Sequence, residues 1–582
     1  MKTFYFLFFL FFASFVQAQV PAPFKLQSPV TIPISISGSF SELRNNHFHA
    51  GVDIRTNSMI GLPIVAPADG FVSRITIEAS NYGKALYLQH ASGITTMYAH
   101  LNEFNQELNQ FVKKEQYRLK SFEIDISLPE EKYFYKAGDT IAFGGNSGAS
   151  KSPHLHFEVR QTQSNWVINP FLFGIGAYDN ISPYITGICL YPIGKNSAIQ
   201  IVYNGKNSTY TKNYFEPVVL RVYKSGGVYK LSGVNMIKVL GKLGLGVECH
   251  DKMNDCANTL DIYKANLKLD DITIFTQERN TYSMEDTRYI HAHRDYTIRY
   301  HQNRQFQRMF LLPNNKITFY KNVVDNGHIK TKYDDTSTVE LELFDFYQNI
   351  TRLVFKVCKT EIPTSLFPFE KDTSYDKLFY FDKANFYATE NIELLFPENS
   401  FYENLKFSYS VQPAKSRTYS EIHKIHKPDI PVQNAYTIRI RANKLPERLH
   451  EKAVIAEVSG ESYRSTGGVY NNGWLESKVK TFGNYTIVAD TAAPKVQLIN
   501  FANNYDLKYT KELKISIYDN LSGINTYNAW IDDEWILLEY DKKKNLLTYK
   551  FDTLPQSIEH SFKIIVTDKV NNSTEITIKF KR

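Results

Sequence analysis

Hydrophobic and polar residues alternate over short runs along most of the chain. Ala85–His90, Ile199–Tyr203 and Leu513–Tyr518 are rich in β-branched or aromatic residues, and Gly, Asn, Asp and Pro separate such runs. Runs of this kind predict β-strands. No long stretch of the sequence repeats its apolar residues at helical spacing between capping residues. The pattern therefore predicts an all-β protein.

Length and composition set the scale of that protein. At roughly 100–200 residues per domain, the 582 residues predict three to five domains. Hydrophobic residues make up 43% of the chain, which is enough for real cores and excludes wholesale disorder. The net charge of +7 is small for this length, so it argues against a dedicated nucleic-acid binder.

The first residues predict the compartment. Lys2 precedes an apolar stretch from Phe4 to Val16, and the small residue Ala18 follows that stretch. This order is typical of a signal peptide over residues 1–18. A membrane anchor is the alternative, but the stretch is shorter than the roughly 20 apolar residues that span a bilayer. We therefore expect cleavage after Ala18, no transmembrane anchor in the mature protein, and export to the periplasm or the cell surface.

Cysteine usage is compatible with an oxidising compartment, which permits disulfides. A hairpin could be closed by Cys249 and Cys256, and Cys189 could pair with Cys358 to join the first and last strands of one domain. Four cysteines allow three pairings, and the sequence alone does not choose among them.

The distribution of residue types divides the exported chain. Six of the 15 His residues lie before residue 157, and after about Tyr178 the sequence becomes rich in Tyr, Lys and Asn. The strand pattern is poorest in the third of the four predicted domains. The predicted domains cover residues 19–178, 179–360, 361–489 and 490–582.

Two pairs of similar segments indicate internal repetition after residue 178. Asn180-Ile-Ser-Pro and Asp490-Thr-Ala-Ala-Pro both look like the approach to a first strand. Asp345-Phe-Tyr-Gln-Asn-Ile-Thr and Asp568-Lys-Val-Asn-Asn-Ser-Thr both precede a closing alternating strand, and their Asp and Asn residues suit a tight turn. This arrangement resembles the immunoglobulin-like β-sandwiches of bacterial surface proteins.

The motif His49-Ala-Gly-Val-Asp53 holds two residue types that bind zinc. Fully extended, four residues span about 13 Å, which is too far for both side chains to bind one ion. The chain must therefore bend between them, and Gly51 offers the freedom to bend. The spacing predicts a strand that ends in a turn. A surface His and a turn Asp that lie together by chance are the alternative.

Polar and apolar residues alternate strictly in a second motif, His154–Arg160. The polar positions are His154, His156, Glu158 and Arg160, and the apolar positions are Leu155, Phe157 and Val159. The alternation predicts a strand whose apolar face enters a core while two imidazoles about 7 Å apart point into one cavity. One imidazole could then bind a metal while the other serves a bound water or the substrate. An exposed strand with a polar face is the alternative.

A third motif, Met97-Tyr-Ala-His100-Leu, places a single His at the end of a predicted strand. Taken alone, such a His is more often structural. Together and in this order, the three motifs resemble the lysostaphin/LytM-type zinc metallopeptidases. The glycine-rich segment 144–148 and Asn169-Pro170 also match that family, so the resemblance runs from residue 49 to residue 170.

The resemblance implies an antiparallel β metallopeptidase domain over residues 19–178 and a role for each motif residue. His49, Asp53 and His156 would be the zinc ligands, and His100 and His154 would be the catalytic histidines. Three protein ligands leave an open position for water, and zinc lowers the pKa of that water toward about 7. The catalytic histidines would orient the water, take its proton and stabilise the developing charge. The implied reaction is hydrolysis of an amide bond without a covalent enzyme intermediate.

Three further residues lie in or near these motifs. His47 is a rival for His49 because it precedes it by two residues on the same expected strand face, but the family pattern favours His49. We interpret His90 as structural, since it belongs to no ligand motif. Glu158 shares the face of His156 and could orient that imidazole.

Two other segments are harder to assign. His291-Ala-His-Arg-Asp295 imitates the ligand motifs, but it lacks the intervening Gly, and an exposed β-strand is the favoured interpretation. The segment Leu101–Tyr135 is longer than in compact members of the family. We expect it to form a loop or hairpin beside the active groove, where it could select or occlude substrate.

The resemblance implies an exported endopeptidase that cleaves peptidoglycan cross-link peptides during cell-wall remodelling. A second hypothesis is a non-catalytic LytM-like regulator or scaffold of wall amidases, but the presence of all five motif residues favours the enzyme. A third hypothesis places wall or glycan binding in the C-terminal β domains, which could also contact other envelope proteins.

Overall fold

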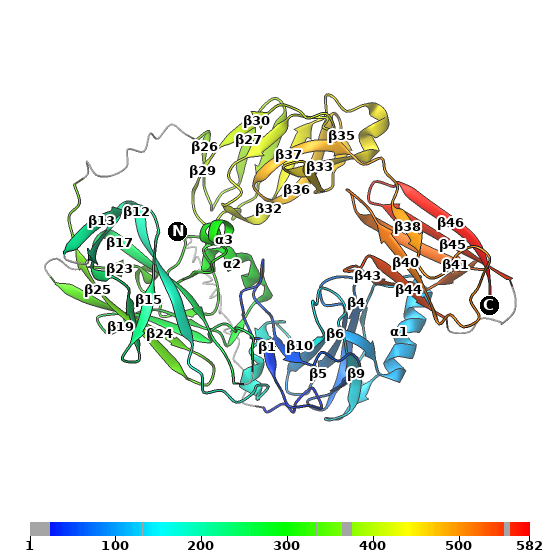
Figure 1. Cartoon of the computed structure of the whole chain (residues 1–582), viewed down its shortest axis with the longest axis horizontal. Coiled ribbons are helices and arrows are strands. Elements are labelled where there is room, and N and C mark those ends of the chain that lie inside the picture. Colours follow the sequence, from blue (N-terminus) through cyan, green and yellow to red (C-terminus); the bar gives the residue numbers. More distant parts are fainter. Residues whose placement is uncertain are drawn as a thin grey trace, which may run out of the picture.

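The computed structural model describes residues 24–130, 132–205, 208–254, 256–331, 335–363, 375–551 and 559–582. The predicted signal peptide, residues 1–18, lies outside the described residues. Strands make up about 51% of the structure and helices about 8%, which confirms the all-β prediction. Four β-rich regions follow one another around a ring, from the blue N-terminal region to the red C-terminal one (Figure 1).

The N-terminal region, residues 24–178, is built on an antiparallel sheet with the strand order β1-β2-β10-β6-β5-β4-β7. Its centre is β10, which pairs with β2 on one side and β6 on the other. The sheet therefore brings all three chemical motifs onto adjacent strands. The strands are β1 (Ile36–Gly38), β2 (Val52–Arg55), β3 (Pro63–Val65), β4 (Gly70–Ile77), β5 (Lys84–Gln89), β6 (Ile94–Phe104), β7 (Ile124–Ser127), β8 (Phe134–Tyr135), β9 (Thr140–Gly144), β10 (His154–Gln161) and β11 (Val167–Ile168), followed by the short helix η1 (Pro170–Phe173).

Strict alternation on β10 produces the predicted two faces. Leu155, Phe157 and Val159 are each 0% exposed and belong to the core of the N-terminal region. Full burial of a side chain of this size contributes about 1.5–3 kcal/mol to folding. This buried apolar face anchors the strand, so the opposite face, with its two imidazoles, is held in a fixed register.

The prediction of a loop or hairpin over Leu101–Tyr135 is wrong, because this segment contains a 14-residue helix, α1 (Gln106–Leu119). The Asn105 side chain caps the helix by accepting a hydrogen bond from the amide of Leu108 at 3.1 Å. The buried face of α1 carries only Leu108, Val112 and Gln116. A polar third position weakens the helical pattern, which explains why the sequence did not reveal the helix.

The second region, residues 179–363, is dominated by the long antiparallel pair β12 and β17. Its strands are β12 (Tyr184–Asn204), β13 (Thr209–Tyr214), β14 (Val218–Leu220), β15 (Val222–Ser225), β16 (Val228–Leu231), β17 (Val234–His250), β18 (Lys264–Leu269), β19 (Ile272–Glu278), β20 (Thr281–Tyr282), β21 (Gln307–Arg308), β22 (Tyr320–Lys321), β23 (Ile329–Lys330), β24 (Thr336–Phe344) and β25 (Ile350–Lys359). Its helices are η2 (Met284–Tyr289), α2 (Ile290–His293), α3 (Tyr296–Gln302) and η3 (Asp325–Gly327).

The second region also completes the N-terminal region. β20 pairs with β11 and so joins the N-terminal sheet. Met253, Leu260 and Tyr282 are buried in the core of the N-terminal region rather than in the core of the second. The second region therefore has a core of its own and also contributes side chains to the hydrophobic core of the N-terminal region.

The third region, residues 375–489, consists of two five-stranded sheets around a common core and a small two-stranded sheet. Its elements are β26 (Lys377–Phe379), β27 (Asn385–Ala388), β28 (Ile392–Phe396), β29 (Leu405–Phe407), β30 (Tyr409–Gln412), β31 (Ile422–Ile425), β32 (Pro431–Arg441), η5 (Glu447–Lys452), β33 (Ala453–Ser459), β34 (Ser462–Ser465), β35 (Val469–Asn471), β36 (Trp474–Thr481) and β37 (Gly483–Ala489).

The fourth region, residues 490–582, is a sandwich of two sheets, β38-β40-β44-β43 and β39-β46-β45-β41-β42, around one core. Its strands are β38 (Lys495–Leu498), β39 (Tyr505–Asp506), β40 (Glu512–Tyr518), β41 (Ile524–Ile531), β42 (Glu534–Ile536), β43 (Glu539–Asp541), β44 (Leu546–Lys550), β45 (Glu559–Asp568) and β46 (Ser573–Lys581).

The ring closes where the fourth region meets the first (Figure 1). Lys84 Nζ on β5 forms an ion pair with Glu539 at 3.1 Å. The ring of Tyr117 on α1 lies edge-on to Trp535, with centroids 5.5 Å apart. The unexpected helix α1 is therefore part of the surface on which the C-terminal sandwich rests.

All four cysteines are free thiols in this fold. Neither of the two pairings considered from the sequence is formed. In the part of the chain that the structure describes, none of the helices combines the length and the hydropathy needed to cross a bilayer.

Candidate metal centre

Strand register brings the first and second motifs together. β10 runs antiparallel to β2, with His156 opposite Asp53. The sequence predicted a strand that ends in a turn between His49 and Asp53. This order is wrong, because His49 lies before the strand and Asp53 lies within β2. Gly51 is needed for space rather than for a bend, since a Cβ there would lie 2.2 Å from the carbonyl oxygen of Phe157 on β10.

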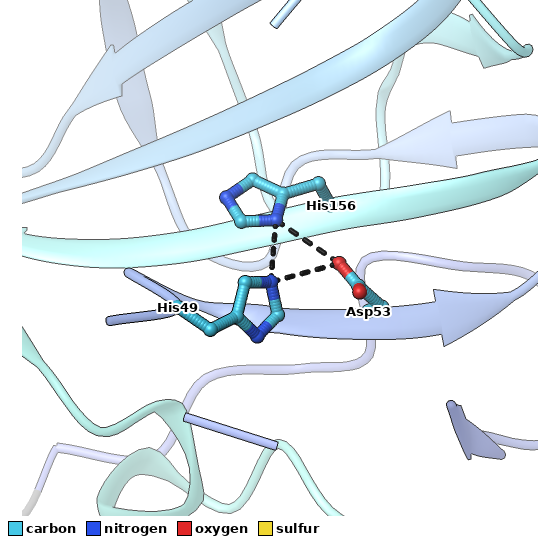
Figure 2. A group of neighbouring side chains, drawn as sticks. All are labelled: His49, Asp53 and His156. Carbon is cyan, nitrogen blue, oxygen red and sulfur yellow. Dashed lines mark hydrogen bonds and ion pairs between the residues drawn. The ribbon is translucent and has the colours of Figure 1, made fainter. Parts of the chain in front are cut away.

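Three ligand atoms converge on one point (Figure 2). His49 Nε2, His156 Nδ1 and Asp53 Oδ1 lie 3.0 Å from one another. The three residues are no more than 8% exposed. This is the triad that the sequence predicted as the zinc ligands, and its atoms lie close enough together to bind one ion.

Hydrogen bonds on the far side of each imidazole fix which nitrogen faces the cluster. His49 Nδ1 donates to the carbonyl oxygen of Ser39 at 2.8 Å, so Nε2 carries the lone pair. His156 Nε2 donates to Glu158 at 2.8 Å, so Nδ1 carries the lone pair whenever this ring is neutral. Two nitrogen lone pairs and a carboxylate oxygen therefore point at the same place, and such a group of acceptors is stable only around a positive charge.

The pKa values of Asp53 and His156 also indicate that the cluster favours a positive charge at its centre. Burial raises the pKa of Asp53, but the neighbouring His49, His154 and His156 outweigh burial and hold it well below its usual value. Burial lowers the pKa of His156, but hydrogen bonds to Asp53 and Glu158 outweigh it and raise the pKa to about 9. A metal at this position must therefore compete with a proton on His156.

Glu158 occupies the position that the sequence suggested for an orienting group. It is 0% exposed, and besides His156 it accepts hydrogen bonds from Tyr82 Oη at 2.8 Å and Arg160 Nε at 2.6 Å. Burial raises the pKa of Glu158, but Arg160 and His156 together lower it far below the usual value. The carboxylate is therefore ionised and holds His156 in one tautomer.

Arg44 is a member of the site that the sequence did not reveal. Its Nη2 donates to Asp53 Oδ2 at 2.7 Å, which leaves Oδ1 for the cluster. Arg294 donates to the carbonyl oxygens of Arg44 at 3.0 Å and Asn45 at 2.7 Å. Arg44 and Arg294 are 250 residues apart in sequence, so no local pattern could have linked them.

The remaining two predicted residues lie beside the cluster with their rings facing each other. The ring centroids of His100 and His154 are 4.9 Å apart. His100 Nδ1 lies 2.9 Å from the carbonyl oxygen of Ser147, and His154 Nδ1 lies 2.8 Å from that of Ser152. Because a carbonyl accepts only from N–H, Nδ1 of each ring carries a hydrogen, and Nε2 is the nitrogen that remains for the chemistry of the cluster.

The surroundings of His100 keep it neutral. Burial, reinforced by the neighbouring His156 and His154, lowers the pKa of His100 to about 3. Its backbone has φ = 60°, in the left-handed region that non-glycine residues rarely adopt. This strained conformation lies at an irregularity in β6, between its pairing with β10, which reaches Ala99, and its pairing with β9, which begins at Leu101.

A cavity of about 780 Å³ opens over the five motif residues. Arg55 and Lys151 line it with positive charge, and Asn258, Met284 and Thr287 contribute from the second region. No described residue of the Leu101–Tyr135 segment lines this cavity, so the segment lies away from the site. The N-terminal region therefore forms most of the wall, and the second region, rather than the insertion, adds the rest of it.

The other His residues have clear positions. His47 is exposed and lies outside the strands, although it lines the cavity. His90 bonds the carbonyl oxygen of Asp69 and the hydroxyl of Thr96, which is a structural arrangement. The expectation of an exposed strand over His291–Asp295 is wrong, because the segment begins within α2, which ends at His293, and His293 is 0% exposed.

Comparisons with known proteins agree with this geometry. A model of peptidase family M23 matches residues 47–117, and a Zu5-like domain model matches residues 376–490. A protein of Haemophilus influenzae, named an uncharacterized metalloprotease, is 29% identical over 23% of this chain and 23% of its own. The DD-carboxypeptidase/endopeptidase Mpg of Neisseria meningitidis is 30% identical over 19% of this chain and 20% of its own.

Among solved structures, the catalytic domain of lysostaphin from Staphylococcus simulans matches with 21% identity and a TM-score of 0.18, over 24% of this chain and 91% of that chain. The aligned part spans about a fifth of the length of the curated relatives. The M23 match lies in the N-terminal region, and the Zu5-like match lies in the third.

Proposed function

The N-terminal region of this chain is a peptidase family M23 domain of the lysostaphin/LytM type, and from this premise we propose that the protein is a metalloendopeptidase that hydrolyses amide bonds in peptidoglycan cross-link peptides. Family M23 consists of zinc metallopeptidases, and the two nitrogens and one carboxylate oxygen of the cluster are ligands that zinc prefers. We further propose that the enzyme acts outside the cytoplasm, in cell-wall remodelling.

One observation carries this proposal. Three acceptor atoms that lie 3.0 Å apart stand next to two histidines, and each of these histidines is anchored through Nδ1 to a backbone carbonyl oxygen. This leaves Nε2 of each ring on the side of the cluster, where His154 Nε2 lies 3.4 Å from Asp53 Oδ1. We assign His49, Asp53 and His156 as ligands and His100 and His154 as catalytic histidines. A non-catalytic scaffold would have no use for the second pair.

The chain's own residues supply the proton transfers. Zinc bound by the three ligands would activate a water and polarise the substrate carbonyl. His100 is neutral at neutral pH because of its lowered pKa, so its Nε2 is available to accept a proton from the attacking water. His154, on the other side of the pair, is placed to stabilise the charge that develops on the carbonyl oxygen or to protonate the leaving amine.

The wall of the cavity supports a peptide substrate that carries carboxylates. Arg55 and Lys151 line the cavity, and muropeptides combine amide bonds with free carboxylates. The relative Mpg is named as a DD-carboxypeptidase/endopeptidase, which suggests bonds next to D-residues in this case too.

Digestion of purified peptidoglycan, followed by mass spectrometry of the muropeptides, tests the proposal. Wild-type protein should release products of amide cleavage, and His154→Ala should release none while it retains zinc. His49→Ala should lose zinc, whereas the neighbouring His47→Ala should keep it, because only His49 faces the cluster. Zinc binding without hydrolysis by the wild-type protein would instead support a regulator of wall amidases.

A further inference from the structure

Two clusters of three aspartates lie outside the candidate metal centre. One consists of Asp179, Asp251 and Asp345, and the other of Asp490, Asp519 and Asp568. In each cluster, one carboxylate oxygen from every residue lies within 4.8 Å of the others. Because like charges at this distance repel, each cluster is stable only when a positive charge or a proton offsets the repulsion.

The first cluster is buried and incompletely bonded. Asp179 and Asp251 are each 5% exposed and Asp345 is 2% exposed. Among the described residues, Asp179 Oδ2 and Asp251 Oδ1 have no hydrogen-bond partner. An unpartnered buried carboxylate oxygen costs several kcal/mol, so these two atoms need a partner that the described residues do not supply.

The first cluster also has room for an ion. The three aspartates line a cavity of about 20 Å³, which is the size that one water or ion needs. Arg279 lines the same cavity, but it is paired with Asp261 at 2.9 Å. Burial and the neighbouring aspartates together raise the pKa of Asp251 to about 8. The carboxylates therefore lack a positive partner among the described residues.

The second cluster repeats the first in sequence and in bonding. Pro183 follows Asp179 by four residues, as Pro494 follows Asp490. Asn349 follows Asp345 by four residues, as Asn572 follows Asp568. In each cluster the Asn side chain connects two of the three aspartates. Asn349 Nδ2 donates to Asp345 Oδ2 and to the Asp179 carbonyl oxygen. Asn572 Nδ2 donates in the same way to Asp568 Oδ2 and to the Asp490 carbonyl oxygen.

The third aspartate of each cluster comes from an equivalent place. Asp251 follows the last residue of β17, and Asp519 follows the last residue of β40. Among the described residues, Asp519 Oδ1 and Ser522 Oγ have no hydrogen-bond partner, and Ser522 is 6% exposed. The amide of Ser522 donates to Asp490 Oδ2 at 2.9 Å, so its unpartnered hydroxyl lies at the second cluster.

We infer that each cluster binds one calcium ion. The ligands offered are oxygens alone, from carboxylates and, in the second cluster, a hydroxyl. Hard cations such as Ca²⁺ prefer such oxygen ligands, whereas the nitrogen-rich cluster of the N-terminal region suits zinc. A divalent ion offsets the repulsion of three carboxylates and gives the unpartnered oxygens a partner.

Both sites lie at junctions between regions of the ring. Asp179 stands between η1 of the N-terminal region and β12, and Asp490 directly follows β37 of the third region. Each ion would tie that connecting segment to two turns of the following β region. The expected effect is a stiffer junction, which helps to maintain the contact between the fourth region and the N-terminal region.

Calcium titration of the full-length mature protein tests the inference. The chain is stripped with a chelator, reloaded with zinc, and titrated with calcium chloride by calorimetry, with elemental analysis of the product. We expect two calcium ions per chain with half-saturation at about 10⁻⁵–10⁻³ M. Asp251→Asn and Asp519→Asn should each leave one, and the double variant none. Binding of fewer than two ions by wild type at about 5 mM calcium, or of two ions by the double variant, overturns the inference.

Thermal melting separates ion binding from an ordinary structural role. Without calcium, Asp251→Asn should melt above the wild type, because Asp251 must either bear a buried charge beside two other carboxylates or take up a proton on folding, and Asn avoids both costs. With calcium, it should melt below the wild type because one site is lost. Asp286→Asn is the matched control: this Asp is also buried, but its partner is Thr318, and the difference from wild type should not depend on calcium. A calcium-independent difference for Asp251→Asn would contradict the inference.

Discussion

Replacing Glu158 by Gln is the sharpest test of how the metal centre is built. The side chain keeps its shape but loses its charge and one of its two acceptor oxygens. Glu158 now serves three donors, at 2.8 Å from His156, 2.8 Å from Tyr82 and 2.6 Å from Arg160. An amide can present its oxygen to Arg160 or to His156, but its NH₂ group must then face the other.

Both orientations have a calculable cost. If the amide oxygen faces Arg160, the NH₂ group faces His156 Nε2, which must then accept, so that the proton moves to the ligand nitrogen Nδ1. Loss of such an orienting partner typically lowers metal affinity by about 10–100-fold, which is about 1.4–2.7 kcal/mol. If the oxygen faces His156, the buried Arg160 loses its carboxylate partner, and breaking a buried ion pair costs about 3–5 kcal/mol of folding stability.

Competition with a coloured zinc chelator measures the affinity, and urea unfolding of the zinc-free protein measures the stability. Tyr82→Phe is the matched control, because it removes one hydrogen bond from Glu158 and leaves the carboxylate, so zinc affinity should change by no more than about threefold. A folded Glu158→Gln protein with a zinc affinity within about twofold of wild type and an unchanged free energy of unfolding would refute the proposed role of this carboxylate.

Three further predictions concern residues outside the cluster. Lys543 donates to the carbonyl oxygens of Asn146 and Ser150. Lys543→Ala should lower kcat on muropeptides by about 2–10-fold without changing the zinc content. Equal kcat values for variant and wild type would contradict this prediction. Arg294→Met should weaken zinc binding several-fold by releasing the Arg44 backbone, measured by the same chelator competition, and unchanged affinity would show that Arg44 needs no such support. Burial lowers the pKa of His423 to about 4; as the pH falls from about 6.5 to about 4, the unfolded chain therefore binds a proton that the folded chain excludes, and up to about 3 kcal/mol of the free energy of unfolding is lost. In urea unfolding, His423→Gln should reduce this loss. Wild type and variant that lose the same free energy of unfolding over this pH range would exclude the assignment.

Lys543 belongs to the fourth region but contacts a segment of the N-terminal region. The segment that it contacts also carries the carbonyl oxygen of Ser147, the hydrogen-bond partner of His100. Contact between the fourth region and this segment therefore offers a physical route by which the C-terminal sandwich affects the catalytic histidines. Whether those β regions also bind wall, glycan or other envelope proteins stays a prediction.

The sequence by itself determined the features that depend on neighbours along the chain. Strict alternation predicted β10 and both of its faces, because successive side chains of a strand point to opposite sides. The three motifs identified all five predicted site residues through their resemblance to a family, and the structure brings those residues together. The repeated Asp and Asn turns at Asp345 and Asp568 were also visible in the sequence, although their connection to a third aspartate was not.

Only the tertiary structure decided the features that depend on strand register and on packing between distant segments. Register places His156 opposite Asp53, and close packing against β10 is what requires Gly51. Helix α1 has a weak pattern because its buried face is short and partly polar. The support of Arg44 by Arg294 and the closure of the cavity by the second region join residues more than 200 positions apart. Such contacts follow from how whole sheets pack, and that packing leaves no periodic trace in the local sequence.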